Sequence, residues 1–112
     1  MCKVLFVGGF DRLVSKYKKE ASKLGCKLCH HCGRCQGGKE KLCRFITQAD
    51  AVFCPLDVNS HTARKVVRES CRKQQKPAFF LPRSSVNEFK RALSKWLKTK
   101  GGHYESSHLP EA

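Results

Sequence analysis

The chain of 112 residues contains 23 Lys and Arg against 9 Asp and Glu, which gives it a formal net charge of +14. This length is typical of one domain with its own hydrophobic core, and no apolar run is long enough to span a membrane. The excess of cations favours an anionic partner, either nucleic acid or a small ligand with carboxylates or phosphates.

In the first half of the chain, hydrophobic periodicity predicts two strands, each followed by a helix. The expected elements are a strand over Lys3–Gly9, a helix over Asp11–Leu24, a strand over Cys26–His31 and a helix over Lys39–Gln48. The first strand ends in Gly8 and Gly9, and two glycines permit a ligand to approach the backbone closely.

The same alternation continues in the second half. The expected elements are a strand over Ala51–Leu56, a helix that begins near residue 60, a strand over Pro77–Leu81 and a helix that opens at residue 85. Asn59 or Ser60 is a suitable N-cap for the third helix, and Ser85 and Glu88 have capping-box spacing. We therefore expect a single domain over residues 1–99 and a flexible tail over residues 100–112.

This order of elements predicts an α/β fold, namely a flavodoxin-like three-layer sandwich with a four-stranded parallel sheet in the order 2-1-3-4. In such sheets, ligands bind at the carboxyl ends of the strands, near the switch point between the first and third strands. Distinctive residues follow all four expected strands: Gly8 and Gly9, His30 and His31, Asp57 with Ser60 and His61, and Arg83 with Ser84. We expect these segments to converge on one edge of the sheet.

A cluster of cysteines overlaps the second of these segments. The chain has eight cysteines, and Cys26, Cys29, Cys32 and Cys35 are evenly spaced. Four thiolates can hold zinc or an iron–sulfur cluster, but Cys26 and Cys29 would point to opposite faces of a strand. A subset of Cys29, Cys32 and Cys35 with a histidine is geometrically easier. Reduced cysteines without a ligand are the alternative.

Non-covalent heme is a second candidate ligand. The string Cys26-Lys-Leu-Cys29-His30 matches the signature for covalent c-type heme, but that attachment occurs outside the cytoplasm. The chain shows no signal peptide, so we expect a cytoplasmic protein in a reducing environment. Non-covalent heme needs an axial imidazole or thiolate and cations for its propionates. The candidates are His30, His31, His61 or Cys54 for the iron and Arg83 for the propionates.

Several short motifs occur in a fixed order over about residues 3–97. They are Gly8-Gly9, His30-His31-x-Gly33, Ala49-Asp50, Asp57-x-x-Ser60-His61, Cys71-Arg72-Lys73, Lys76-Pro77 and Arg83-Ser84. With these motifs the chain resembles a small bacterial family long called a domain of unknown function, some of whose members are described as sensors that contain heme instead of cobalamin. The resemblance implies a fold like that of cobalamin-binding domains and heme b as a ligand. The chain departs from the family at Cys32, where the family has an aspartate, and it adds Cys26, Cys29 and Cys35, which could change the cofactor to zinc or an iron–sulfur cluster.

The first hypothesis is therefore a non-catalytic sensor domain that holds heme b or a thiolate-bound metal and responds to ligand exchange or thiol oxidation. Its signal would need a partner protein or a neighbouring domain, and the chain could form a homodimer. The alternatives are a basic nucleic-acid-binding regulator stabilised by zinc or an iron–sulfur cluster, and a thiol oxidoreductase. The candidate cofactor-binding residues are Gly8, Gly9, His30, His31, Cys54, Asp57, Ser60, His61 and Arg83, and the candidate metal ligands are Cys26, Cys29, Cys32 and Cys35.

Overall fold

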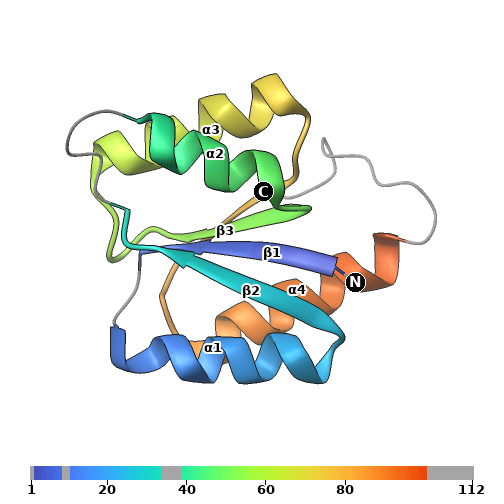
Figure 1. The fold of residues 1–112 in the computed structure, drawn as a ribbon. Helices are drawn as coiled ribbons and strands as arrows, with labels where there is room; N and C mark the ends of the chain where they lie inside the picture. Colours follow the sequence, from blue (N-terminus) through green and yellow to red (C-terminus); the bar gives the residue numbers. More distant parts are fainter. Residues whose placement is uncertain (1, 9–10, 34–38, 101–112) are drawn as a thin grey trace.

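Four strands alternate with four helices along the chain (Figure 1). The computed structural model describes residues 2–8, 11–33 and 39–100, so all but the first residue of the expected tail lies outside the described residues. In chain order, the elements are β1 (Cys2–Val7), α1 (Asp11–Lys23), β2 (Cys26–His31), α2 (Glu40–Gln48), β3 (Ala51–Pro55), α3 (His61–Gln74), β4 (Ala78–Leu81) and α4 (Val86–Lys100).

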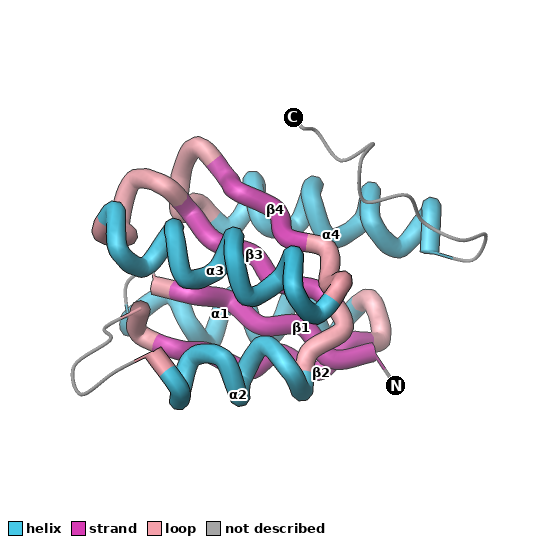
Figure 2. The backbone as a smooth tube through the Cα atoms, turned by 90° about the horizontal axis from the view of Figure 1, so that it is seen from above, coloured by secondary structure: helices cyan, strands magenta, loops and turns pink. Residues whose placement is uncertain are grey.

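The strands form one parallel sheet in the order β2-β1-β3-β4. Parallel strands need crossover connections, and α1, α2 and α3 provide the three that link the four strands, whereas α4 follows the last strand. Helices α1 and α4 cover one face of the sheet, and α2 and α3 cover the other (Figures 1 and 2). The predicted α/β class and strand order are confirmed, and the architecture is consistent with a flavodoxin-like sandwich.

The layer between the sheet and the α1/α4 pair is built on aromatic side chains. Phe89 of α4 packs edge-on against the rings of Phe6, Tyr17 and Phe53, at centroid distances of 5.3, 5.6 and 5.2 Å. All four side chains are fully buried. Because edge-to-face pairs add to the stabilisation from burial, this cluster fixes α1 and α4 against the central strands.

The opposite layer is mainly aliphatic. Its strand residues are Leu5, Val7, Val52 and Cys54, and its helix residues are Leu42 and Ile46 of α2 with Val67 and Cys71 of α3. On β1 these side chains alternate with Val4 and Phe6, which face α1 and α4. Since both faces are covered, the central strands read as continuous apolar runs in the sequence.

Local signals set the ends of several elements. Ser60 Oγ accepts a hydrogen bond from the Ala63 amide and Ser85 Oγ accepts one from the Glu88 amide, both at 3.1 Å, so the two predicted serine caps are present. Strand β1 ends at Val7 rather than at Gly9, because Gly8 has a φ of +83°, outside the β region. Among the described helices, none combines the length and the apolar character needed to cross a membrane.

Candidate functional site

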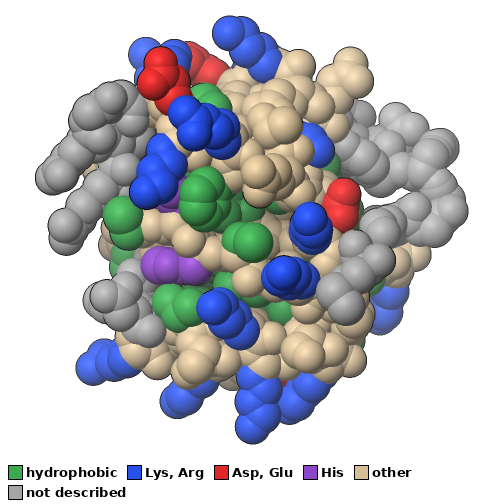
Figure 3. Space-filling view, viewed as in Figure 1, with side chains coloured by type: hydrophobic (Ala, Val, Ile, Leu, Met, Phe, Trp, Pro, Cys, Tyr) green, Lys and Arg blue, Asp and Glu red, His purple; other side chains and the backbone are tan. Residues whose placement is uncertain are grey.

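Segments that follow all four strands meet at one edge of the sheet, on the left in Figure 1. We call this edge the carboxyl rim and define it as Gly8, His30–Gly33, Leu56–His61, Arg83 and Ser84. Backbone hydrogen bonds carry the strand pairing into the rim, from the Gly8 amide to the His31 carbonyl at 2.7 Å and from the Leu56 amide to the Leu81 carbonyl at 2.8 Å. Histidine side chains show at this end of the molecule, between apolar and cationic groups (Figure 3).

The side chain of Asn59 joins two strand ends at the centre of the rim. Its Nδ2 donates to the carbonyls of Val7 and Pro55, the last residues of β1 and β3, at 2.9 and 2.7 Å. An amide nitrogen carries two hydrogens, so these two bonds use both of them. Asn59 therefore ties β1 to β3 at the switch point of the sheet.

Two glycines make room for the Asn59 amide. Gly8 and Gly33 have φ values of +83° and +87°, a region that L side chains seldom adopt. A Cβ atom on Gly8 would lie 2.5 Å from Asn59 Oδ1, and one on Gly33 would lie 2.6 Å from the same atom. Both positions thus require glycine for its backbone conformation and for the space it leaves. The segments after β1 and β2 close together around Asn59.

His31 is buried and held in one orientation. Its Nδ1 accepts a hydrogen bond from the Gly33 amide at 2.9 Å, and its ring packs edge-on against Phe45 with centroids 5.2 Å apart. Burial lowers the pKa of His31 below its usual value, and the charges of Lys41 and His30 lower it further. The ring is therefore held neutral, with its proton on Nε2.

His30 is half-buried, and its hydrogen-bond partner lies at Nε2, whereas that of His31 lies at Nδ1. Its Nε2 lies 2.7 Å from the Gly8 carbonyl oxygen, and since a carbonyl can only accept, Nε2 donates. In the neutral ring, Nδ1 then carries the lone pair. Nothing in the described part of the chain hydrogen-bonds to that nitrogen.

His61 is the first residue of α3 and is exposed. Its Nδ1 accepts from Arg64 Nη2 at 3.4 Å, a long contact that restrains the ring weakly. The neighbouring Ser60 uses its hydroxyl to cap the helix. Of the two, the imidazole of His61 is the group available to a ligand.

Asp57 joins the ends of β3 and β4. Its Oδ2 accepts from the Ser84 amide at 3.1 Å and from the Ser84 hydroxyl at 3.3 Å, while the Tyr17 hydroxyl donates to the Ser84 carbonyl. Burial and the charge of Asp57 raise the pKa of Tyr17, so the phenol keeps its proton. Arg83 is exposed beside this network.

Cys54 faces the α2/α3 layer, and its side chain is fully buried. Burial raises the pKa of its thiol to about 12, even though Arg64 and Arg68 act in the opposite direction. Its sulfur lies 3.5 Å from Asn59 Nδ2. The group is therefore a protonated thiol of the core beneath the rim.

The structure does not bring the predicted thiolate ligands together. Cys26 is buried in the α1/α4 layer, whereas Cys29 is exposed on the opposite face of the same strand, and Cys32 is exposed after it. Cys35 and Gly9 lie outside the described residues. Within residues 2–8, 11–33 and 39–100, no three His, Cys, Asp or Glu side chains lie close enough together to hold a metal ion.

The sequence left the N-cap of α3 open between Asn59 and Ser60, and it did not predict the actual role of Asn59 or the exposure of Leu56. Asn59 is not the N-cap of α3, because Ser60 occupies that position. Asn59 is a polar loop residue that lies far along the chain from Gly8 and Gly33. Only the fold brings the three residues together, so the sequence could not show this role. Leu56 follows directly on β3 and is 36% exposed, so it adds an apolar surface to the rim.

A family model described as an uncharacterized protein conserved in bacteria (DUF2325) matches residues 3–96. The chain belongs to this family. The matched segment runs from β1 into α4 and includes every residue of the carboxyl rim. No curated protein and no solved structure matches the chain.

The surroundings of Gly8 and Gly33 predict that alanine lowers stability more at these two positions than at Gly25. Gly25 also has a positive φ, of +80°, but a Cβ there would meet nothing within 4 Å, so Gly25→Ala is the matched control. We expect Gly25→Ala to lower the free energy of unfolding by about 1 kcal/mol, and Gly8→Ala or Gly33→Ala to lower it by about 2 kcal/mol or more. Chemical denaturation measures all three. Equal costs at the three sites would contradict the proposed packing of Asn59.

The lowered pKa of His31 predicts a dependence of stability on pH. In the unfolded chain a histidine titrates near 6.5, whereas in the folded protein it resists protonation. The unfolded state therefore binds more protons as the pH falls below about 6.5, and folding stability is lost in that window. His31→Gln keeps a side-chain acceptor and removes the titration. Denaturant titrations at pH 8 and pH 5 measure the free energy of unfolding. Between these two pH values, the variant should lose less of this free energy than the unmodified protein. An equal loss in both would contradict a buried neutral His31.

Proposed function

We propose that this family member is a non-catalytic sensor domain that binds heme b at the carboxyl rim. The observation that carries the proposal is the hydrogen bond from His30 to the Gly8 carbonyl. Imidazoles that bind metals commonly donate their other ring N–H to a backbone carbonyl, which fixes the tautomer and the ring orientation. The resemblance of the chain to sensors that contain heme instead of cobalamin supports the same ligand.

Two imidazoles of the rim suit iron. His30 is half-buried and its Nδ1 carries the lone pair, so we assign it as the principal axial ligand. His61 is exposed, and its one long contact with Arg64 costs little to break. It is the second candidate for an axial position.

Two other sequence candidates suit iron less well. His31 uses its Nδ1 lone pair on the Gly33 amide, and its proton is on the other ring nitrogen. Cys54 is buried, and its thiol has a pKa of about 12, so the thiolate that iron requires is disfavoured. We assign to both residues the role of supporting the rim rather than binding the ligand.

The remaining rim groups suit the periphery of a porphyrin. Leu56 is one of two exposed large apolar side chains in the described residues, and Val58 beside it is partly buried. Arg83 is exposed at the end of β4 and can pair with a propionate. When bound, heme supplies an iron that exchanges axial ligands and changes oxidation state. The role of this chain would be to hold the porphyrin ring and to orient the imidazole of His30.

Reconstitution with hemin tests the proposal. We expect the purified protein to develop a Soret band in an absorption titration. We expect His30→Ala to bind hemin about tenfold or more weakly, because it removes the oriented ligand. His61→Ala should weaken binding less and shift the position of the band.

One variant serves as the control in the same titration. Thr62→Ala changes an exposed residue beside His61 and should retain the affinity of the unmodified protein. A protein without a Soret band, or one whose affinity is unchanged in both His30→Ala and His61→Ala, would refute the proposal.

A separate observation favours a second function, the binding of nucleic acid. The outer face of α4 has an open groove lined by Asn87, Lys90, Arg91, Ser94, Lys95 and Lys98. Four cations on one helix face, in a chain of net charge +14, suit a phosphate backbone. Helix α4 lies on the face opposite α3 (Figure 2), so lysines of α3 provide a control.

The dependence of binding on salt tests this second function. The logarithm of the association constant should fall linearly with the logarithm of the salt concentration, and Lys90→Gln/Lys95→Gln should reduce that slope by roughly two. Lys65→Gln/Lys73→Gln on α3 removes the same charge. Equal slopes for the two double variants would show that only overall charge matters and would exclude a dedicated α4 surface.

A further inference from the structure

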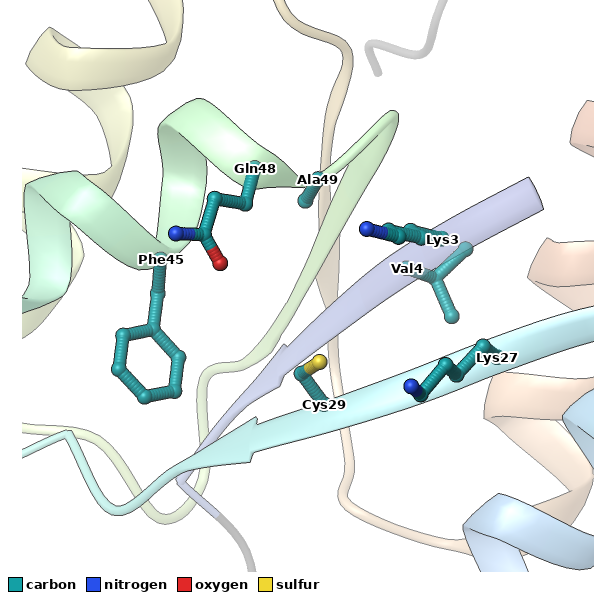
Figure 4. A pocket seen from close by; sticks show the side chains of 7 residues that line it. All are labelled: Lys3, Val4, Lys27, Cys29, Phe45, Gln48 and Ala49. Carbon is teal, nitrogen blue, oxygen red and sulfur yellow. The ribbon is translucent and has the colours of Figure 1, made fainter. Parts of the chain in front are cut away.

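A cavity of about 220 Å³ lies against β1 and β2, and none of the carboxyl rim residues lines it. Its lining residues are Lys3, Val4, Lys27, Cys29, Phe45, Gln48 and Ala49 (Figure 4). Strand β2 is at the edge of the sheet, and both Lys27 and Cys29 are exposed, so the cavity opens to solvent. The side chains of β1 and β2 form one wall, and those of α2 form the other (Figure 4).

Two lysines face this cavity as cross-strand neighbours. In the parallel register of β1 and β2, Lys3 pairs with Lys27 and Leu5 pairs with Cys29. Like charges on directly opposite residues are unfavourable. Asp50 stands near the cavity, where its Oδ2 accepts the backbone amide of Lys3 at 2.9 Å. Neither lysine ammonium has an ion-pair partner in the part of the chain that the structure describes, so an anionic ligand would relieve their repulsion.

The cavity also presents a thiol. The sulfur of Cys29 points into the space between α2 and the two strands, and the Lys27 side chain extends along β2 toward Cys29 (Figure 4). Among the described cysteines, Cys29 and Cys32 are exposed, while Cys26, Cys54 and Cys71 are buried. Cys29 alone of these lines the cavity. A ligand held there by its negative charge would therefore contact an accessible sulfur.

We propose that this cavity binds a small disulfide that carries carboxylates, and that Cys29 is its site of covalent modification. The carboxylates pair with Lys3 and Lys27, and the apolar part of the ligand packs on Phe45. The Cys29 thiol loses its proton to solvent, and its sulfur attacks one sulfur of the disulfide. The ligand's S–S bond breaks as the new S–S bond forms, and the other half leaves as a thiolate that takes up a proton. The disulfide is the oxidant, and no other reactant is needed.

The modification would lie close to the carboxyl rim. Phe45 lines the cavity with Cys29, and the same ring packs edge-on against His31. A group attached to Cys29 is therefore separated from the buried imidazole by one aromatic side chain. The proposal does not require heme, and the following experiment is carried out without it, so its outcome is independent of the function proposed above.

Glutathione disulfide, which is anionic, and cystamine, which is cationic, are suitable probes. Each is added to the fully reduced protein, and peptide mass spectrometry follows the mixed disulfide at Cys29 and at Cys32. The net charge of the chain favours the anionic probe everywhere, so Cys32 serves as the internal reference. We expect the preference for the anionic probe to be about tenfold greater at Cys29 than at Cys32.

A pair of matched variants makes the test specific to the cavity. Lys3→Gln/Lys27→Gln should reduce the preference of Cys29 for glutathione disulfide over cystamine to the value found at Cys32. Lys16→Gln/Lys18→Gln removes the same charge from exposed positions of α1, on the other face of the sheet, and should leave the preference unchanged. Equal preferences at Cys29 and Cys32 in the unmodified protein, or the same effect from both double variants, would overturn the proposal.

Discussion

The carboxyl rim depends on the two hydrogen bonds that the Asn59 amide donates to the last carbonyls of β1 and β3. A parallel sheet diverges at its switch point, because the helices that follow β1 and β3 leave on opposite faces. Asn59 holds the two strand ends together there. Gly8 and Gly33 leave the space that the Asn59 amide occupies. Glycine loses more conformational entropy on folding than other residues, so this close packing has an entropic cost.

The same packing sets the chemistry of the two adjacent histidines. Gly8, in its left-handed conformation, offers its carbonyl to His30, and Gly33 offers its amide to His31. Both rings are thereby held with a proton on Nε2, but His31 uses its Nδ1 lone pair within the protein, whereas no described group hydrogen-bonds to the Nδ1 of His30. Two adjacent histidines thus differ in the hydrogen bonds that they make, although the sequence does not distinguish them. This difference underlies the proposal that His30 orients an iron.

The sequence predicted the fold well because the fold depends on local signals. Short apolar runs predicted the strands, and period-3.6 patterns with the Ser60 and Ser85 caps predicted the helices. The alternation of strands with helices then favoured the strand order. The site was harder to predict. The opposite directions of Cys26 and Cys29 follow from strand geometry and were anticipated, but the burial of Cys54 and the difference between His30 and His31 depend on contacts with residues far away in the chain. The role of Asn59 likewise depends on two carbonyls that only the tertiary structure brings near.

We propose that a planar anionic porphyrin binds at the carboxyl rim with His30 as its oriented ligand. The most direct measurement is an NMR titration with gallium protoporphyrin, a diamagnetic analogue of heme that produces ring-current shifts. The account predicts the largest shifts at Gly8, His30, Leu56, His61 and Arg83, with little change at Lys27 and Gln75 on the opposite edge. Shifts centred on Lys27 and Cys29, or no shifts at saturating porphyrin, would contradict it.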